Sequence, residues 1–127
     1  MEFDNSSPIY QQLAREWRQL IVSNKWPVGS KVPSVRELAA SYGVNPNTVQ
    51  RALSELEREG LAQSQRTLGR FITEDVELIQ QTKESLAEEL IEHFVQEVSD
   101  LNLDPDGLRR ALDRALEKIN NKRGDQV

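Results

Sequence analysis

The chain has 127 residues, enough for one ordinary domain or for a small domain with a short appendage. Its 37% hydrophobic and 29% charged residues are typical of a folded protein and exclude a disordered composition. The absence of cysteine excludes disulfides, thiolate metal sites and cysteine nucleophiles. The apolar runs are too short for a transmembrane helix, and the acidic start Met1–Asp4 lacks the apolar core of a secretory signal. We therefore expect a cytoplasmic protein without a membrane partner.

The net charge of −5 is divided unevenly along the chain. Residues 1–73 carry nine Lys/Arg and seven Asp/Glu, a net +2, whereas residues 74–127 carry seven and fourteen, a net −7. Such asymmetry is typical of a mildly basic nucleic-acid-binding domain joined to an acidic appendage. The overall negative charge therefore does not exclude DNA binding, but the small number of basic groups predicts weak non-specific affinity.

The dipeptide Ser7-Pro8 predicts the start of a first helix, with Ser7 as N-cap and Pro8 in the first turn. Trp26–Gly29 is expected to lie beyond its end, and Lys31–Pro33 to be extended, because a residue before proline avoids helical geometry. The apolar stripe of this helix has three- and four-residue steps: Ile9, Leu13, Trp17, Leu20 and Ile21.

Two further helices follow at once. Ser34 and Glu37 have the spacing of a capping box, and Gly43 is suited to the left-handed residue that ends a helix. Asn45-Pro46 then predicts another capped start, and Gly60 the next end. Two short helices joined by a tight glycine turn predict a helix-turn-helix. The expected buried residues of its second helix are Val49, Ala52 or Leu53, and Leu56.

The rest of the chain predicts a hairpin and then two helices. Leu61–Ser64 and Arg70–Thr73 read as short strands around the turn Gln65–Gly69, which would form a wing after the helix-turn-helix. A longer amphipathic helix is expected over roughly 75–100, and Asp104-Pro105 predicts the start of another. Residues 120–127 are expected to be a polar, frayed tail.

The helix after Asn45-Pro46 has the side chains for reading DNA. With Val49, Leu53 and Leu56 in the core, the opposite face presents Asn47, Gln50, Arg51 and Ser54. Asn and Gln can pair with adenine, and Arg with guanine. Thr48 and the free N–H groups of the first turn suit phosphate. Most helices have a solvated polar face, but the capped helix before this one and the hairpin after it favour DNA.

Several submotifs resemble the winged-helix domain of GntR-family bacterial regulators, in the family's order and spacing over roughly residues 8–73. They are Lys31–Ala39 (KVPSVRELA), Gly43–Val49 (GVNPNTV), Ala52-Leu53, Leu56-Glu57 and Glu59–Leu61 (EGL). The short C-terminal region resembles the YtrA-like subfamily, which lacks the large effector domains of other branches. The resemblance implies a homodimeric repressor that binds a near-palindromic operator, often of transport genes.

The resemblance implies DNA contacts at Arg36, along Asn45–Thr48, at Gln50 and in the wing around Gly69. Many family members have arginine where this chain has Pro46 and Gln50, whereas here Arg51 carries the charge one position on. A second wing glycine usually stands where this chain has Thr67. Arg66 and Arg70 are alternative phosphate contacts. The predicted DNA-binding residues are Ser34, Arg36, Asn45, Asn47, Thr48, Gln50, Arg51, Arg66, Gly69 and Arg70.

The two C-terminal helices are too few to cover both of their apolar faces, so a second copy related by a two-fold axis is expected to do so. Packing of the pair onto the chain's own winged helix is the alternative. The predicted fold is mainly α (α+β): a winged helix-turn-helix over 1–73 with a small β-hairpin wing, then a helical dimerisation region over 74–127. The predicted dimerisation residues are Leu86, Leu90, Phe94, Val98, Leu108, Leu112, Leu116 and Ile119.

Other function classes have little support in the residues. The single histidine, His93, has no cysteine or second histidine as companion, so neither an enzyme nor a metal or other cofactor is expected. A winged helix that binds proteins through its acidic helices, without binding DNA, is the second alternative. About 50 residues of helix pair leave little room for a preformed ligand pocket, so the existence of a small-molecule effector stays open.

Overall fold

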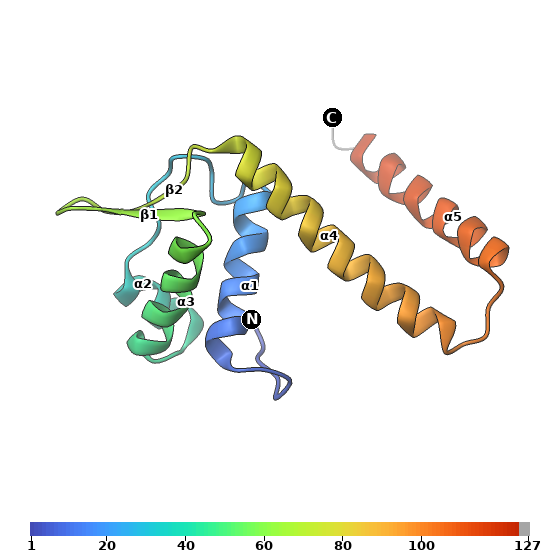
Figure 1. Ribbon diagram of the computed structural model, residues 1–127, viewed down its shortest axis with the longest axis horizontal. Coiled ribbons are helices and arrows are strands. Elements are labelled where there is room, and N and C mark those ends of the chain that lie inside the picture. Colours follow the sequence, from blue (N-terminus) through green and yellow to red (C-terminus); the bar gives the residue numbers. More distant parts are fainter. Residues whose placement is uncertain (125–127) are drawn as a thin grey trace. The chain divides into compact units, whose positions relative to one another are not determined.

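The computed structural model describes residues 1–124, and the predicted tail residues 125–127 lie outside them. The elements follow the order α1, α2, α3, β1, β2, α4, α5 (Figure 1). The mainly α fold with a two-stranded hairpin confirms the predicted fold class. The chain divides into a compact unit over Met1–Leu86 and a second unit from Ala87 onward. The functional boundary at residue 73 stays a prediction, while the packing boundary lies at Leu86.

Helix α1 spans Ile9–Val22 and begins one residue later than the sequence predicts. Pro8 itself is the N-cap, with extended backbone, and its carbonyl accepts the N–H groups of Gln11 and Gln12. The prediction that Ser7 caps this helix was wrong. The side chain of Gln12 instead donates to the carbonyls of Ser7 and Asp4, at 2.8 and 2.9 Å. These two hydrogen bonds hold the segment before α1 against the first turn of the helix, in place of a cap by the Ser7 hydroxyl.

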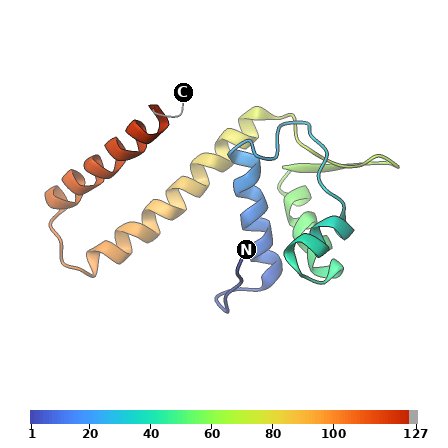
Figure 2. The same cartoon turned by 180° about the vertical axis from the view of Figure 1, so that it is seen from behind.

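The helix-turn-helix consists of α2 (Val35–Tyr42) and α3 (Pro46–Arg58), which pack together and, through α3, onto α1 (Figures 1 and 2). Gly43 ends α2 with a φ of 65°, the left-handed conformation that only glycine adopts without strain. Asn45 caps α3, and Pro46 occupies its first turn. The two predicted helices are therefore confirmed, as are the predicted end of α2 at Gly43 and the predicted start of α3 at Asn45-Pro46.

The wing is an antiparallel hairpin of β1 (Ala62–Gln65) and β2 (Gly69–Ile72), in register Ala62 opposite Ile72. The segment before α2 also lies along β2, because Val32 N–H donates to the carbonyl of Arg70 and Ile72 N–H to that of Ser30. The extended piece predicted at Lys31–Pro33 thus connects the wing to the start of α2.

The wing turn holds a threonine in an unfavourable conformation. Thr67 has a φ of 67°, the left-handed region that a β-branched residue rarely adopts. It is also the position where the family usually has glycine. We expect Thr67→Gly to raise the free energy of unfolding by about 0.5–1 kcal/mol, because the relief of left-handed strain exceeds the added chain entropy. Urea denaturation measures this gain. Thr67→Ala is the control: it keeps the Cβ atom, so an equal gain there would contradict a conformational cause.

The core lies among the three N-terminal helices and the base of the hairpin. Leu13 and Trp17 of α1 and Leu53 of α3 are fully buried. Arg18 of α1 and Glu59, which follows α3, form an ion pair at 2.6 Å on the core's edge. The first turns of α4 also contact this core through Leu78 and Ile79. The buried apolar cluster comprises Leu13, Ala14, Trp17, Ile21, Val32, Leu38, Val49, Ala52, Leu53, Leu56, Leu61, Ala62 and Ile72.

The C-terminal helices are α4 (Val76–Ser99) and α5 (Pro105–Gly124). Asp104 starts α5 as predicted, since its carboxylate accepts the N–H of Gly107 at 3.2 Å. The tail prediction was wrong for residues 120–124, which continue α5. Neither helix has a buried residue within residues 1–124 of the single chain. In this described part of the chain, no helix combines the length and apolar character needed to cross a membrane.

Candidate nucleic-acid interface

Helix α3 presents a polar face at its N-terminal end, as its spacing predicts. Val49, Leu53 and Leu56 point into the core with no exposed surface. The opposite face is exposed over two turns, and its side chains are donors and acceptors of the kind that read base edges. The residues of this exposed face are Asn47, Gln50, Arg51 and Ser54.

The backbone at the start of α3 is already hydrogen-bonded. The side chain of Asn45 accepts the N–H of Asn47 at 2.8 Å, and its carbonyl accepts the N–H of Thr48 at 3.0 Å. Pro46 has no N–H. The predicted free N–H groups of this first turn are therefore not free, because the asparagine cap satisfies them locally. Since the backbone N–H groups are used, the hydroxyl of Thr48 is the group left for a phosphate. Thr48 is half-buried, so part of its side chain stays accessible.

One edge of the α3 face is set by α1. The guanidinium carbon of Arg51 lies 3.9 Å from the centre of the Tyr10 ring, an arrangement that attracts a cation to the aromatic face. Arg51 stays exposed. Stacking restricts its rotamers but leaves the N–H groups at its rim to donate in the plane, as guanine recognition requires.

The N-terminus of α2 carries the next predicted residues. The hydroxyl of Ser34 accepts the N–H of Glu37 at 3.1 Å and donates to the Glu37 carboxylate at 3.1 Å. The predicted capping box is therefore present in part, since the carboxylate binds the hydroxyl rather than the backbone N–H of Ser34. Arg36, two positions on, is exposed.

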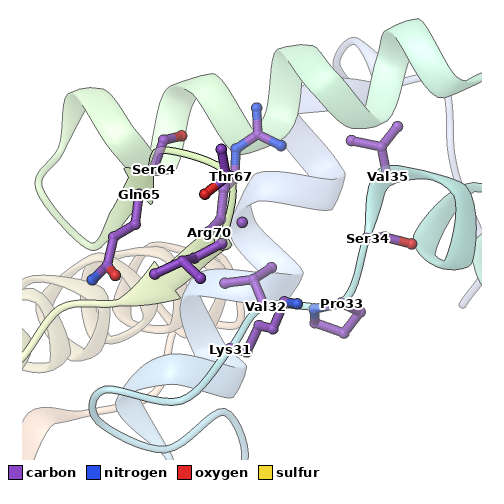
Figure 3. A pocket seen from close by; sticks show the side chains of 11 residues that line it. Lys31, Val32, Pro33, Ser34, Val35, Ser64, Gln65, Thr67 and Arg70 are labelled. Atoms are coloured by element: carbon purple, nitrogen blue, oxygen red, sulfur yellow. The ribbon is translucent and has the colours of Figure 1, made fainter.

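A surface hollow of about 510 Å³ separates the approach to α2 from the wing (Figure 3). Lys31 and Ser34 line it on one side and Gly69 on the other. A Cβ atom on Gly69 would lie 3.0 Å from Cε of Lys31, so the glycine makes room for the lysine side chain. Lys31 was not among the predicted contacts. Its place beside the wing, two residues before Pro33, becomes evident only once this segment is paired with β2.

The two wing arginines differ. Arg66 is exposed in the turn. Arg70 reaches toward α3 (Figure 3), where its Nε atom donates to Glu57 and a terminal nitrogen donates to Oε1 of Gln50 at 2.6 Å. Burial raises the pKa of Glu57, but hydrogen bonds from Ser64 and Arg70 and the arginine's charge outweigh it, and the pKa is lowered. Glu57 is therefore ionised at neutral pH and neutralises Arg70.

The sequence did not indicate that Tyr10 and Glu57 are neighbours of the exposed polar face of α3. Tyr10 lies 41 residues before Arg51, and Glu57 lies thirteen before Arg70. The only local signal is that Glu57 falls two turns after Gln50, on one side of the same helix. Such spacing is common and does not by itself predict a shared arginine.

The model of bacterial regulatory proteins of the gntR family matches residues 9–72, half of the chain. This stretch covers α1, the helix-turn-helix and the wing. The chain belongs to the GntR family. Its membership confirms the resemblance that the sequence motifs indicate.

Two relatives from Bacillus subtilis (strain 168) extend this finding. The uncharacterized HTH-type transcriptional regulator YhcF is 41% identical over 102 residues, 80% of this chain and 84% of the relative. The HTH-type transcriptional repressor YtrA is 44% identical over 71 residues, 56% of this chain and 55% of the relative. The similarity to YhcF continues beyond the winged helix into the C-terminal helices.

Solved structures agree. A GntR family transcriptional regulator from Listeria monocytogenes has a TM-score of 0.80 at 37% identity, covering 88% of this chain and 98% of that one. The AraR DNA-binding domain, solved in complex with operator ORR3, has a TM-score of 0.52 at 27% identity, covering 57% of this chain and 88% of that one. These relatives are regulators, not enzymes, and this GntR-family chain is a DNA-binding transcriptional regulator.

Proposed function

We propose that this GntR-family regulator is a cytoplasmic homodimeric repressor of a near-palindromic operator. The observation that carries the dimer is the apolar surface of α4 and α5, none of whose described residues is buried in the single chain. The similarity to YtrA, a repressor by name, supports repression. A two-fold axis through the C-terminal helices would pair two reading heads, whose half-sites would lie about 34–36 Å apart, one turn of DNA.

The proposed contacts are divided by chemistry. Asn47, Gln50 and Arg51 are proposed to read base edges, because they are exposed at the end of α3 that enters the major groove. Groups at the start of α2, in the first turn of α3 and in the wing turn are proposed to bind phosphate and to set the register of α3 on the duplex. These are Arg36, Thr48 and Arg66, together with Ser34, whose hydroxyl would exchange the Glu37 carboxylate for the phosphate. Asn45 and Gly69 would act through the shape of the backbone that they allow.

Two arginine variants test this division. We expect Arg51→Ala to cost about 1–3 kcal/mol of operator binding and to relax the preference at one base step. We expect Arg66→Ala to weaken binding to all sequences alike and to make the affinity less dependent on salt. Competition gel shifts with operator variants measure both effects. Tyr10→Phe is the matched control for Arg51, because it keeps the ring under the guanidinium. Identical behaviour of Arg51→Ala and Arg66→Ala would contradict the division.

The function itself is tested on the promoter upstream of the chain's own gene and on those of neighbouring genes, including any transport genes. We expect footprints with two-fold symmetry and an affinity that falls as the salt concentration rises. Transcription from that promoter should fall when the protein is added. Absent or sequence-independent binding would overturn the proposal and favour a winged helix that binds proteins.

A further inference from the structure

Helix α3 and the wing are joined by four side chains. Ser64 and Arg70 lie opposite each other in the hairpin register, so both project from the same side of the wing. Ser64 donates to Oε1 of Glu57 at 2.7 Å, and Nε of Arg70 donates to the same atom. A terminal nitrogen of Arg70 donates to Oε1 of Gln50 at 2.6 Å. We call Gln50, Glu57, Ser64 and Arg70 the wing clamp.

The clamp decides which end of the Gln50 amide faces Arg70. A guanidinium has five N–H donors and no acceptor, so only the amide oxygen of Gln50 can face it. The amino end of the amide is then turned away from Arg70. Gln50 is exposed, and this amino group is the part of the side chain left to meet a ligand.

This polarity matters for base recognition. The usual pairing of glutamine with adenine uses both ends of the amide, since the oxygen accepts from N6 and the amino group donates to N7. At Gln50 the oxygen already accepts from a cation, and the approaching N6 amino group of adenine would meet arginine N–H donors. Guanine presents two acceptors, O6 and N7, on the same edge. The Gln50 oxygen keeps a second lone pair, but arginine N–H donors stand beside it, so the donors of this array match guanine and disfavour adenine.

Glu57 makes the arrangement stable. Its carboxylate holds Nε of Arg70, and the side chains of this ion pair are only 22% and 30% exposed for Arg70 and Glu57. Hydrogen bonds to charged groups are stronger than neutral ones. Arg70 is thus neutralised and directed at α3, which leaves little of its charge for the phosphate contact suggested by the sequence.

We propose that Arg70, held by Glu57, is a positioning residue that presets Gln50 as a hydrogen-bond donor, so that Gln50 reads guanine rather than adenine. This inference rests on the proposed function, in which α3 enters the major groove of an operator. Arg70 acts through Gln50 and sets the preference at one base step.

The first test needs no DNA. The side-chain amide of Gln50 gives a pair of resonances in an amide NMR spectrum of the full chain, assigned by their loss in Gln50→Ala. We expect these resonances to shift in Arg70→Ala and in Glu57→Gln, but not in the control Arg66→Ala, whose arginine lies outside the clamp. Unchanged Gln50 resonances in Arg70→Ala would overturn the clamp.

The second test measures base preference. The step read by Gln50 is the one at which Gln50→Ala loses discrimination in competition gel shifts. We expect the wild-type chain to prefer guanine there by about tenfold over adenine, the size of one good base contact. In Arg70→Ala the amide is free to pair with adenine, so the preference should fall to parity or reverse. Glu57→Gln should move it in the same direction by a smaller factor, while preferences at other steps stay unchanged.

Three outcomes would count against the inference. A wild-type preference for adenine at that step would overturn it. An equal loss of affinity for all sequences in Arg70→Ala would also overturn it, by making Arg70 a phosphate contact or a structural residue. Circular dichroism and urea denaturation of the variants show whether such a loss reflects unfolding. Failure of the wild-type chain to bind any operator would overturn the proposed function and this inference with it, even with the clamp seen by NMR.

Discussion

Replacement of Leu90 and Phe94 by aspartate is expected to convert the proposed dimer into a monomer. Their side chains are 58% and 40% exposed in the single chain and lie one turn apart on α4. Burial of such a side chain contributes about 1.5–3 kcal/mol. In a symmetric dimer both copies carry both changes, so four apolar side chains are lost from the interface. Even at half of the lower estimate for each side chain, the loss is about 3 kcal/mol, which weakens dimerisation about a hundredfold.

Sedimentation at tens of micromolar protein, an order of magnitude at which specific dimers with micromolar affinity persist, measures this change. Operator binding should fall at least as far, because a monomer contacts only one half-site. Ser85→Asp with Gln96→Asp is the matched control: it adds the same charge at two exposed polar positions of α4. A variant of Leu90 and Phe94 that still sediments as a dimer would exclude this part of α4 from the interface. A monomeric wild-type chain would exclude the dimer.

The exposed apolar surface is wider than the stripe predicted from sequence. It also includes Ile91 and Val95, on the row beside the predicted one, and Leu101 and Leu103 in the connection between the helices. Leu86, Val98 and Leu108 of the predicted set are half-buried. The assignment of these residues to a dimer stays a proposal. Its support is that an apolar area of this kind on a regulator's surface is usually covered by a partner.

The largest expected effect on stability comes from Trp17→Ala. Trp17 has no exposed surface and packs against two other aromatic rings, at 5.8 Å from Trp26 and 5.7 Å from Tyr42 between ring centres. It joins α1 to α2 and to the loop after α1. Truncation of a buried tryptophan costs about 3–5 kcal/mol, a large share of the 5–15 kcal/mol that is typical of a domain. Urea denaturation should therefore show a much lower midpoint or an unfolded protein.

Trp17→Phe separates packing from polarity. The indole Nε1 atom of Trp17 is buried without a hydrogen-bond partner among the described residues. An unpaired buried donor itself costs about 1–3 kcal/mol, so phenylalanine removes this cost while it loses part of the ring's contacts. We expect Trp17→Phe to cost less than half as much as Trp17→Ala. Leu68→Ala, at an exposed apolar residue of the wing turn, is the control and should have little effect. Equal costs for both tryptophan variants would contradict the unpaired donor.

The sequence by itself determined the local structure. Gly43 and the pairs Asn45-Pro46 and Asp104-Pro105 each act within a few residues of the chain, by capping a helix or by adopting a left-handed backbone. The pattern of apolar residues likewise placed Leu53 and Leu56 in the core. Hydrogen bonds and side-chain spacing within one or two helical turns are present in the sequence itself, so these features followed from it.

The tertiary structure decided which hydrogen-bonding groups on the exposed face of α3 remain available to a ligand. Arg51 stacks on the ring of Tyr10, and Arg70 donates to the carboxylate of Glu57. Both contacts join residues from different elements, so no local sequence pattern predicts them. The start of α1 also differs from the prediction. The side chain of Gln12, one turn further on, donates to the carbonyl of Ser7, and Pro8 takes the N-cap position expected for Ser7. The sequence determines which donors and acceptors α3 carries. The packing of α1 and the wing against α3 decides which of them remain for DNA, because each guanidinium and each amide oxygen has limited bonding capacity.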